Sequence, residues 1–167
     1  SITDNSTNYR GGGVYIAQGG VFRMASGTIS GNTAQNGVGG VYNGGTLSVC
    51  GNTRIFGNTA GNVYLPTGRT VTVNAALGDS ASIGVAVENP TAGVIVAASA
   101  SGVTLDEAAA GKFTSEDSGY HIALSGGKLV LASDAPTPVD VPAAVRGLVY
   151  NGQTQIGVNP GTGYTLS

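Results

Sequence analysis

Residues that could do chemistry are sparse in the first half of this 167-residue chain. Residues 1–78 contain a single carboxylate, Asp4, whereas glycoside hydrolysis needs two carboxyl groups and a Ca²⁺ site needs several oxygen ligands. Basic residues are present without an acidic cluster beside them: Arg10, Arg23, Arg54 and Arg69. We therefore predict no catalytic residues and interpret these arginines as part of a solvated face.

The remaining candidate groups are isolated from one another. His121 is the only histidine in the sequence; it alternates with Tyr120 and Ile122 and is expected to face solvent, and a lone histidine cannot build a metal site. Cys50 is the only cysteine, has no evident base partner, and is interpreted as a small packed residue. The pair Glu116–Asp117 is expected to form a solvated turn rather than to bind Ca²⁺. We expect neither a metal nor a cofactor.

Three tyrosines are the strongest candidates for contact with a ligand. Tyr15, Tyr42 and Tyr64 each follow a valine, which predicts that they face outward in a column able to bind sugars or a protein partner. The alternative is that the three rings pack on one another and shield the sheet beneath them. An ice-binding threonine face is disfavoured, because the Thr-x-Thr pattern occurs only at Thr70 and Thr72 among the corresponding positions.

A repeat of 26 to 27 residues must position these side chains. The string at Ile2–Ser6 recurs at Ile29–Ala34 and again at Ile55–Ala60, at spacings of 27 and 26 residues. A Val-Tyr unit and a third alternating segment keep step with it. Glycine and asparagine lie between the segments and are expected at corners, where they accept positive φ at low cost. The pattern predicts three short strands per coil.

A solenoid stacks equivalent positions of successive coils above one another. Asn5, Asn32 and Asn58 are therefore expected to form a structural ladder at one corner, worth about 1 kcal/mol net per hydrogen bond and serving mainly to fix the register. Two interior stacks of apolar side chains are also expected: Ile2, Ile29 and Ile55, and Val14, Val41 and Val63.

The strings Gly-Gly-Val-Tyr and Ile-Ser-Gly-Asn-Thr-Ala resemble those of Gly- and Asn-rich β-helix (pectin-lyase-like) segments in bacterial cell-surface and adhesin-type proteins. The resemblance covers residues 1–75. It implies an all-β, right-handed parallel β-helix and an extracellular location at the cell surface. It implies no particular activity, because this is a fold class.

We expect coils over residues 1–78, N-terminally truncated, and a C-terminal cap over 79–132 that covers the open strand edges. The cap should contain strands, a short helix at Thr104–Gly111 and a hairpin formed by Tyr120–Leu124 and Lys128–Leu131. Within the helix, Thr104 and Glu107 match a capping box and Gly111 a C-terminal cap, and Phe113 should anchor it to the last coil.

The sequence from residue 133 onward does not follow the pattern of the coils and the cap. Residues 133–144 are expected to be a Pro-rich linker, and residues 145–167 resemble the start of a bacterial Ig-like or mucin-binding-type repeat. Both ends of the chain are interpreted as cuts in a longer protein.

The composition of the chain disfavours two classes of function. The net charge is −2 and no basic cluster occurs, which disfavours nucleic-acid binding, and no apolar run is long enough to insert into a membrane. We expect a non-enzymatic, extracellular structural or adhesin module of a bacterial surface protein, with a host glycan or surface protein as partner. The alternative is the C-terminal part of a carbohydrate-active β-helix, a polysaccharide lyase, hydrolase or glycan binder, whose active coils are missing.

Overall fold

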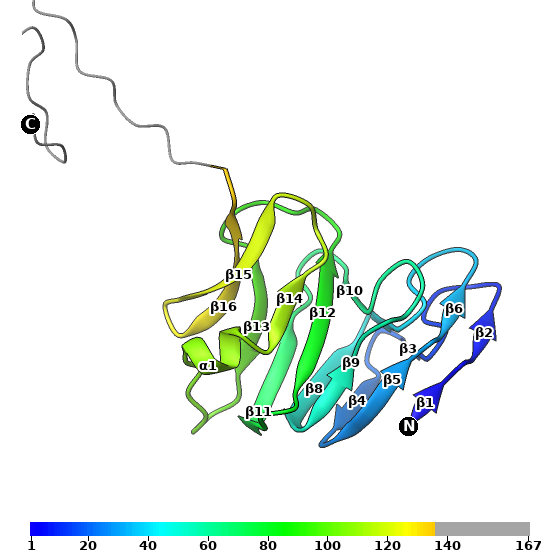
Figure 1. Ribbon diagram of the computed structural model, residues 1–167, viewed down its shortest axis with the longest axis horizontal. Helices are drawn as coiled ribbons and strands as arrows, with labels where there is room; N and C mark the ends of the chain where they lie inside the picture. The colour runs from blue at the N-terminus through cyan, green and yellow to red at the C-terminus, as the bar shows by residue number, and fades with distance from the viewer. Residues whose placement is uncertain (136–167) are drawn as a thin grey trace, which may run out of the picture. The chain divides into compact units, whose positions relative to one another are not determined.

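The computed structural model describes residues 1–135, which form a nearly all-β parallel solenoid of about four turns with one short helix (Figure 1). The predicted fold class is confirmed. The expected linker at 133–144 lies outside the described residues except for its first three positions, and the expected Ig-like repeat at 145–167 lies outside them entirely.

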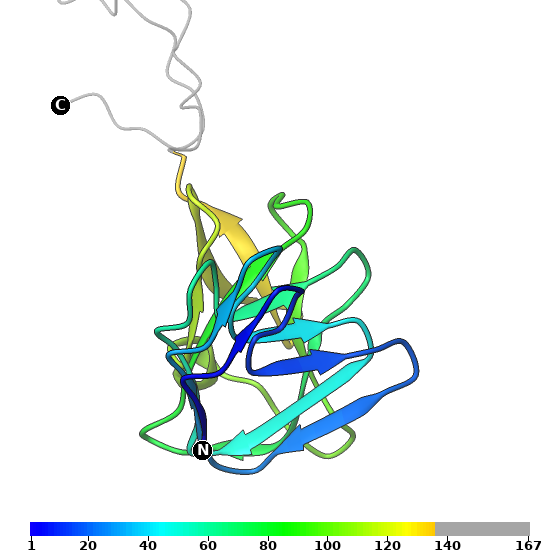
Figure 2. The same ribbon diagram turned by 90° about the vertical axis from the view of Figure 1, so that its right-hand side faces the viewer.

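Successive coils run through three faces, seen from the N-terminal end in Figure 2. The first face contains β1 (Ile2–Thr3), β5 (Gly27–Ser30) and β9 (Thr53–Ile55). The second contains β3 (Val14–Ile16), β7 (Val41–Asn43) and β10 (Val63–Leu65). The third contains β4 (Val21–Met24), β8 (Thr46–Gly51), β11 (Val71–Leu77) and β13 (Ile95–Ser99).

Parallel pairing continues past residue 78, where the sequence repeat fades. Strand β12 (Ser82–Val87) pairs with both β9 and β10, so the first and second faces become one sheet, and β14 (Phe113–Ser115) adds to β12. The first two coils also carry an additional short strand at the corner between these faces, where β2 (Ser6–Thr7) pairs with β6 (Thr33–Ala34). Those two coils therefore have four strands rather than the expected three.

The interior consists of apolar columns that run across the coils. Ile2 pairs in register with Ile29 and Ile29 with Ile55, which confirms the predicted stack, and the column continues through Ile83 to Phe113. Phe113 is 5% exposed and ends the column. Each large side chain buried in this way contributes about 2 kcal/mol. The valine stack is also confirmed, and it continues into β12 at Val85.

The corner glycines serve two different purposes. Asp4, Gly31 and Gly57, at equivalent positions, have φ of 58°, 66° and 63°, while the asparagines that follow them do not take positive φ. The expectation that asparagine supplies this conformation was therefore wrong. Gly40 illustrates the second purpose, because its φ is not positive. A Cβ at this position would lie 2.1 Å from the carbonyl oxygen of Asn62, so the close approach of the two backbones requires glycine.

An amide ladder runs along the corner between the first two faces. The backbone N–H and the Nδ2 of Asn5 both donate to Oδ1 of Asn32, at 3.0 and 2.9 Å. Asn32 bonds Asn58 in the same two ways, and Asn58 bonds Asn62, with the same pair of distances each time. Asn62 in turn donates through its backbone N–H and its Nδ2 to the two carboxylate oxygens of Glu116. Every link points the same way, and a carboxylate, which only accepts, terminates the ladder.

Replacing Asn32 by alanine should lower the free energy of unfolding by about 3 kcal/mol, because this fully buried residue both donates and accepts, and its loss leaves buried polar groups without partners. Asn36→Ala is the control, since Asn36 is exposed and its Nδ2 donates only to the Asn8 carbonyl. Urea unfolding followed by circular dichroism measures both; equal effects would contradict the ladder's role.

Gly84→Ala tests the end of the ladder. A Cβ at Gly84 would lie 2.6 Å from Nδ2 of Asn62 and 2.8 Å from Oε1 of Glu116, so the variant should lose about 2 kcal/mol in thermal or urea unfolding. Gly111→Ala is the matched control, because its nearest atoms would be 3.6 Å away and its φ is −62°. A Gly84→Ala variant as stable as Gly111→Ala would show that the ladder's end tolerates displacement.

The short helix α1 (Glu107–Ala110) is capped differently from the expectation. Its N-cap is Asp106, whose Oδ1 accepts from the backbone N–H of Ala109 at 2.8 Å, so the proposed capping box of Thr104 with Glu107 was wrong. Gly111 does occupy the C-cap, with a right-handed φ.

The predicted hairpin is confirmed and closes the third face. Strands β15 (Tyr120–Ser125) and β16 (Lys128–Ser133) pair antiparallel around Gly126 and Gly127, which have φ of 55° and 72°. Strand β16 pairs antiparallel with β13, so the hairpin covers the edge of the last parallel strand on this face (Figure 1).

Candidate functional site

A groove of about 400 Å³ lies beside the second face, where corners of unequal length meet. Asn32 is nine positions before Val41, but Asn58 is only five before Val63. The longer corner supplies one wall of the groove, residues 34–38, and the shorter corner contributes Ala60. The other lining side chains that carry charge or an aromatic ring are Arg10, Tyr42, Tyr64 and Glu88.

The tyrosines form a stacked column. Tyr15, Tyr42 and Tyr64 occupy one register position of parallel strands, and the strand spacing of about 4.8 Å brings their rings together. Ring centroids lie 5.2 Å apart between Tyr15 and Tyr42 and 5.8 Å apart between Tyr42 and Tyr64, with interplanar angles of 7° and 16°. Tyr9 tilts onto Tyr15 at 6.0 Å. Neighbouring rings therefore cover most of the ring faces, as in the packing alternative, while Tyr15 stays 49% exposed.

Arg10 lies against the middle of the column. Its Nη1 donates to the hydroxyl of Tyr42 at 3.3 Å, and its guanidinium carbon lies 5.3 Å from the Tyr42 ring centroid. The hydrogen bond to Tyr42 raises the pKa of Arg10 above its ordinary value, so the side chain is fully charged. Arg10 is exposed, as expected of a solvated arginine, but it also lines the groove.

Glu88 supplies the one carboxylate among the groove residues. Its Oε2 accepts from the backbone N–H and the hydroxyl of Thr67, at 2.8 and 2.7 Å. These two bonds, the backbone bond more strongly, lower the pKa of Glu88, which is therefore ionised at neutral pH. Within residues 1–135, Glu88 forms no ion pair with Arg10, so both charges remain available to a ligand.

Tyr64 lies near the Glu88 end of the groove. Burial, and next the negative charge of Glu88, raise the pKa of the Tyr64 hydroxyl, so this group remains a neutral hydrogen-bond donor.

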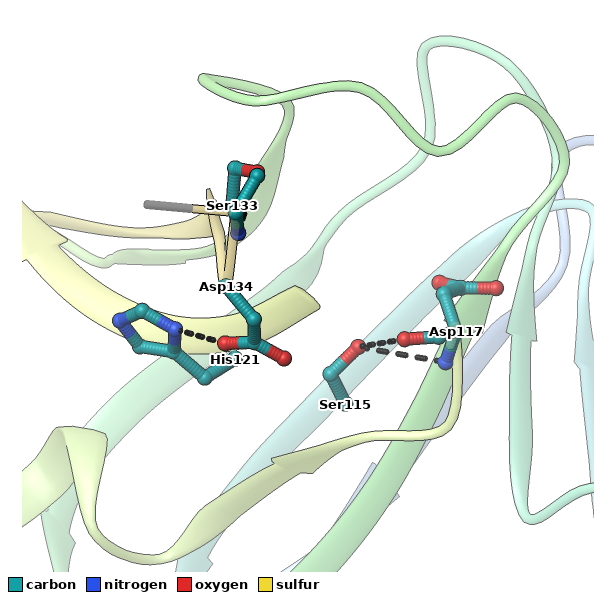
Figure 3. A network of polar contacts seen from close by, with 6 residues as sticks. Ser115, Asp117, His121, Ser133 and Asp134 are labelled. Atoms are coloured by element: carbon teal, nitrogen blue, oxygen red, sulfur yellow. Dashed lines mark hydrogen bonds and ion pairs between the residues drawn. The ribbon is translucent and has the colours of Figure 1, made fainter. Parts of the chain in front are cut away.

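A second polar cluster lies near the hairpin and does not form a catalytic arrangement (Figure 3). His121 is exposed, as predicted, and its Nδ1 lies 2.5 Å from Oδ1 of Asp134. Ser115 exchanges hydrogen bonds with the backbone of Asp117 instead, and the second ring nitrogen of His121 points away from Ser115 (Figure 3). A serine nucleophile would need that nitrogen as its base, so the cluster lacks the geometry of a catalytic triad.

The pair Glu116–Asp117 does more than form a solvated turn. Glu116 is exposed but terminates the amide ladder, and Oδ2 of Asp117 accepts from the backbone N–H of Val87 at 3.0 Å. Partial burial raises the pKa of Asp117. Cys50 is half-buried and free, in line with a small packed residue.

The described part of the chain contains no group of three histidine, cysteine, aspartate or glutamate side chains placed to hold a metal ion. In the same residues, no helix has the length and apolar character to span a membrane. No protein-family model, curated protein or solved structure matches the chain. The groove is therefore interpreted from its own residues.

Replacing Thr67 by valine should move the pKa of Glu88 part of the way back toward the ordinary glutamate value, because the hydroxyl bond is lost and the backbone bond remains. The depressed pKa makes a stability contribution that is present above the ordinary glutamate pKa and is lost as pH falls through the lowered value. The valine variant should therefore lose less free energy of unfolding than the wild type as the pH falls through this range. A ¹³C NMR titration of the Glu88 carboxyl carbon checks the shift, and Thr114→Val, exposed on β14, should leave it unchanged.

Proposed function

We propose that this chain is a non-enzymatic, extracellular module of a bacterial surface protein, in which a stiff β-solenoid presents the tyrosine-lined groove to a glycan. The observation that carries the proposal is the meeting of the stacked tyrosines with one charged arginine and one ionised glutamate that do not pair with each other. Concave sites that combine aromatic surface with a few convergent polar groups are typical of ligand recognition.

Binding without catalysis is supported by the composition of the groove. Its lining, as far as residues 1–135 provide it, contains one carboxylate, Glu88, whereas glycoside hydrolysis uses two. The extracellular location and the bacterial source come from the resemblance of residues 1–75 to surface-protein β-helices. A parallel solenoid suits a surface role, because each coil contacts only its neighbours and the coils together form an extended scaffold.

Binding of the full chain to a printed glycan array tests this function. At least one glycan should bind, and Arg10→Gln should weaken its affinity about tenfold, the loss expected for a hydrogen bond from a charged group. Arg54→Gln is the matched control, because Arg54 lies 4.6 Å over the Phe56 ring, away from the groove, and this variant should bind as the wild type does.

Three results would contradict the proposal. These are the absence of any bound glycan, equal weakening by Arg54→Gln and Arg10→Gln, and the appearance of cleaved glycan when the protein is incubated with its ligand. The first two remove the binding site, and the third replaces binding with catalysis.

A further inference from the structure

We propose that a neutral pyranose ring stacks on Tyr64 at the level of Ala86, taking the place that a fourth tyrosine would have in the column. This subsite rests on the glycan-binding function proposed above and assigns it a ligand class and a position.

The column stops at Ala86 for a reason visible in the register. Val63 pairs with Val85 and Tyr64 with Ala86, so Ala86 holds the position that tyrosine holds in the three preceding coils. Among residues 1–135, Tyr42 has a tyrosine ring on each side, whereas Tyr64 has one only on the Tyr42 side. A methyl group cannot cover a phenol ring, so one face of Tyr64 has no ring partner in the described part of the chain.

A ring at the level of Ala86 would keep the spacing of the column. Successive parallel strands lie about 4.8 Å apart, and the existing tyrosines fill that spacing with one ring per strand. A pyranose ring presents polarised C–H groups on its flatter face, and the negative face of an aromatic ring attracts them. The sugar would therefore continue the stack that the protein's own side chains end.

The polar groups of the groove favour a ligand that carries hydroxyls and no net charge. Arg10 has N–H donors beyond the one bonded to Tyr42, and Oε1 of Glu88 accepts no hydrogen bond from the described residues. A hydroxyl of the stacked ring donates to Glu88. Arg10 bonds Tyr42, two strands before Ala86, so it donates to a hydroxyl of the next sugar along the groove. An acidic sugar would be repelled by Glu88, and by Asp117 beside Val87, while Arg10 disfavours a cationic ligand.

The test fills the subsite with a protein ring. In Ala86→Tyr, a fourth tyrosine should extend the column and lower the affinity for neutral oligosaccharides at least about tenfold. Ala98→Tyr is the matched control: Ala98 is also a half-buried alanine on a parallel strand, but it lies on the third face beside Thr72. Both variants of the 167-residue chain are titrated against neutral glucan, mannan, galactan and chitin oligosaccharides, with sialylated and uronate-containing glycans as the comparison.

Loss of binding in Ala86→Tyr together with retention in Ala98→Tyr supports the subsite. Undiminished binding in Ala86→Tyr overturns the subsite and leaves the proposed function standing, as does wild-type binding to acidic glycans alone. A wild type that binds no glycan overturns both.

A second measurement covers the case in which Ala86→Tyr does not fold. In NMR spectra of the wild type titrated with the bound neutral oligosaccharide, the ring protons of Tyr64 should shift more than those of Tyr15, which lies at the opposite end of the column. A larger shift at Tyr15 overturns the assignment.

Discussion

The amide ladder from Asn5 to Glu116 is the interaction on which the other features depend. Asn5, Asn32 and Asn58 each contribute two donors, the backbone N–H and Nδ2, to one oxygen of the next asparagine, so a slip of one coil by a single position would break two bonds at once. In a parallel sheet a one-residue slip also turns every interior side chain outward. The hydrogen bonds of the ladder and the packing of the interior side chains therefore specify the same register. Glu116 gives the ladder a defined end, because a carboxylate needs no further acceptor.

The candidate site follows from that register. Fixed stacking places Tyr15, Tyr42 and Tyr64 directly over one another, and the change in corner length between the second and third coils opens the groove beside them. The repeat thus supplies a regular aromatic surface, and two departures from the repeat make it specific. One is the shorter corner after Asn58, and the other is the replacement of tyrosine by Ala86 in β12. A ligand that binds this surface would contact the irregular coils rather than the regular ones.

Sequence alone predicted the features that depend on local periodicity and turn chemistry, and it missed those that depend on contacts between distant segments. The stacks of Ile2, Ile29 and Ile55 and the hairpin at Gly126–Gly127 follow from local periodicity and turn chemistry, so both could be identified without coordinates. The role of Glu116 could not, because it lies 54 residues from Asn62 and only folding brings them together. Glu88 was missed for a different reason, because it follows β12, a strand outside the clear repeat. Asp106 could have been identified as the helix cap, since aspartate at that position is a common N-cap signal.

We propose that the register of the coils builds a groove that binds a neutral oligosaccharide beside Arg10 and Glu88. A crystal structure of the full chain soaked with a neutral oligosaccharide would show where the sugar binds. The expected result is a stacked column of Tyr15, Tyr42 and Tyr64 with a pyranose ring packed on the free face of Tyr64 and the hydroxyls of the bound oligosaccharide bonded to Glu88 and Arg10. A sugar bound elsewhere, or tyrosines that do not stack, would contradict it.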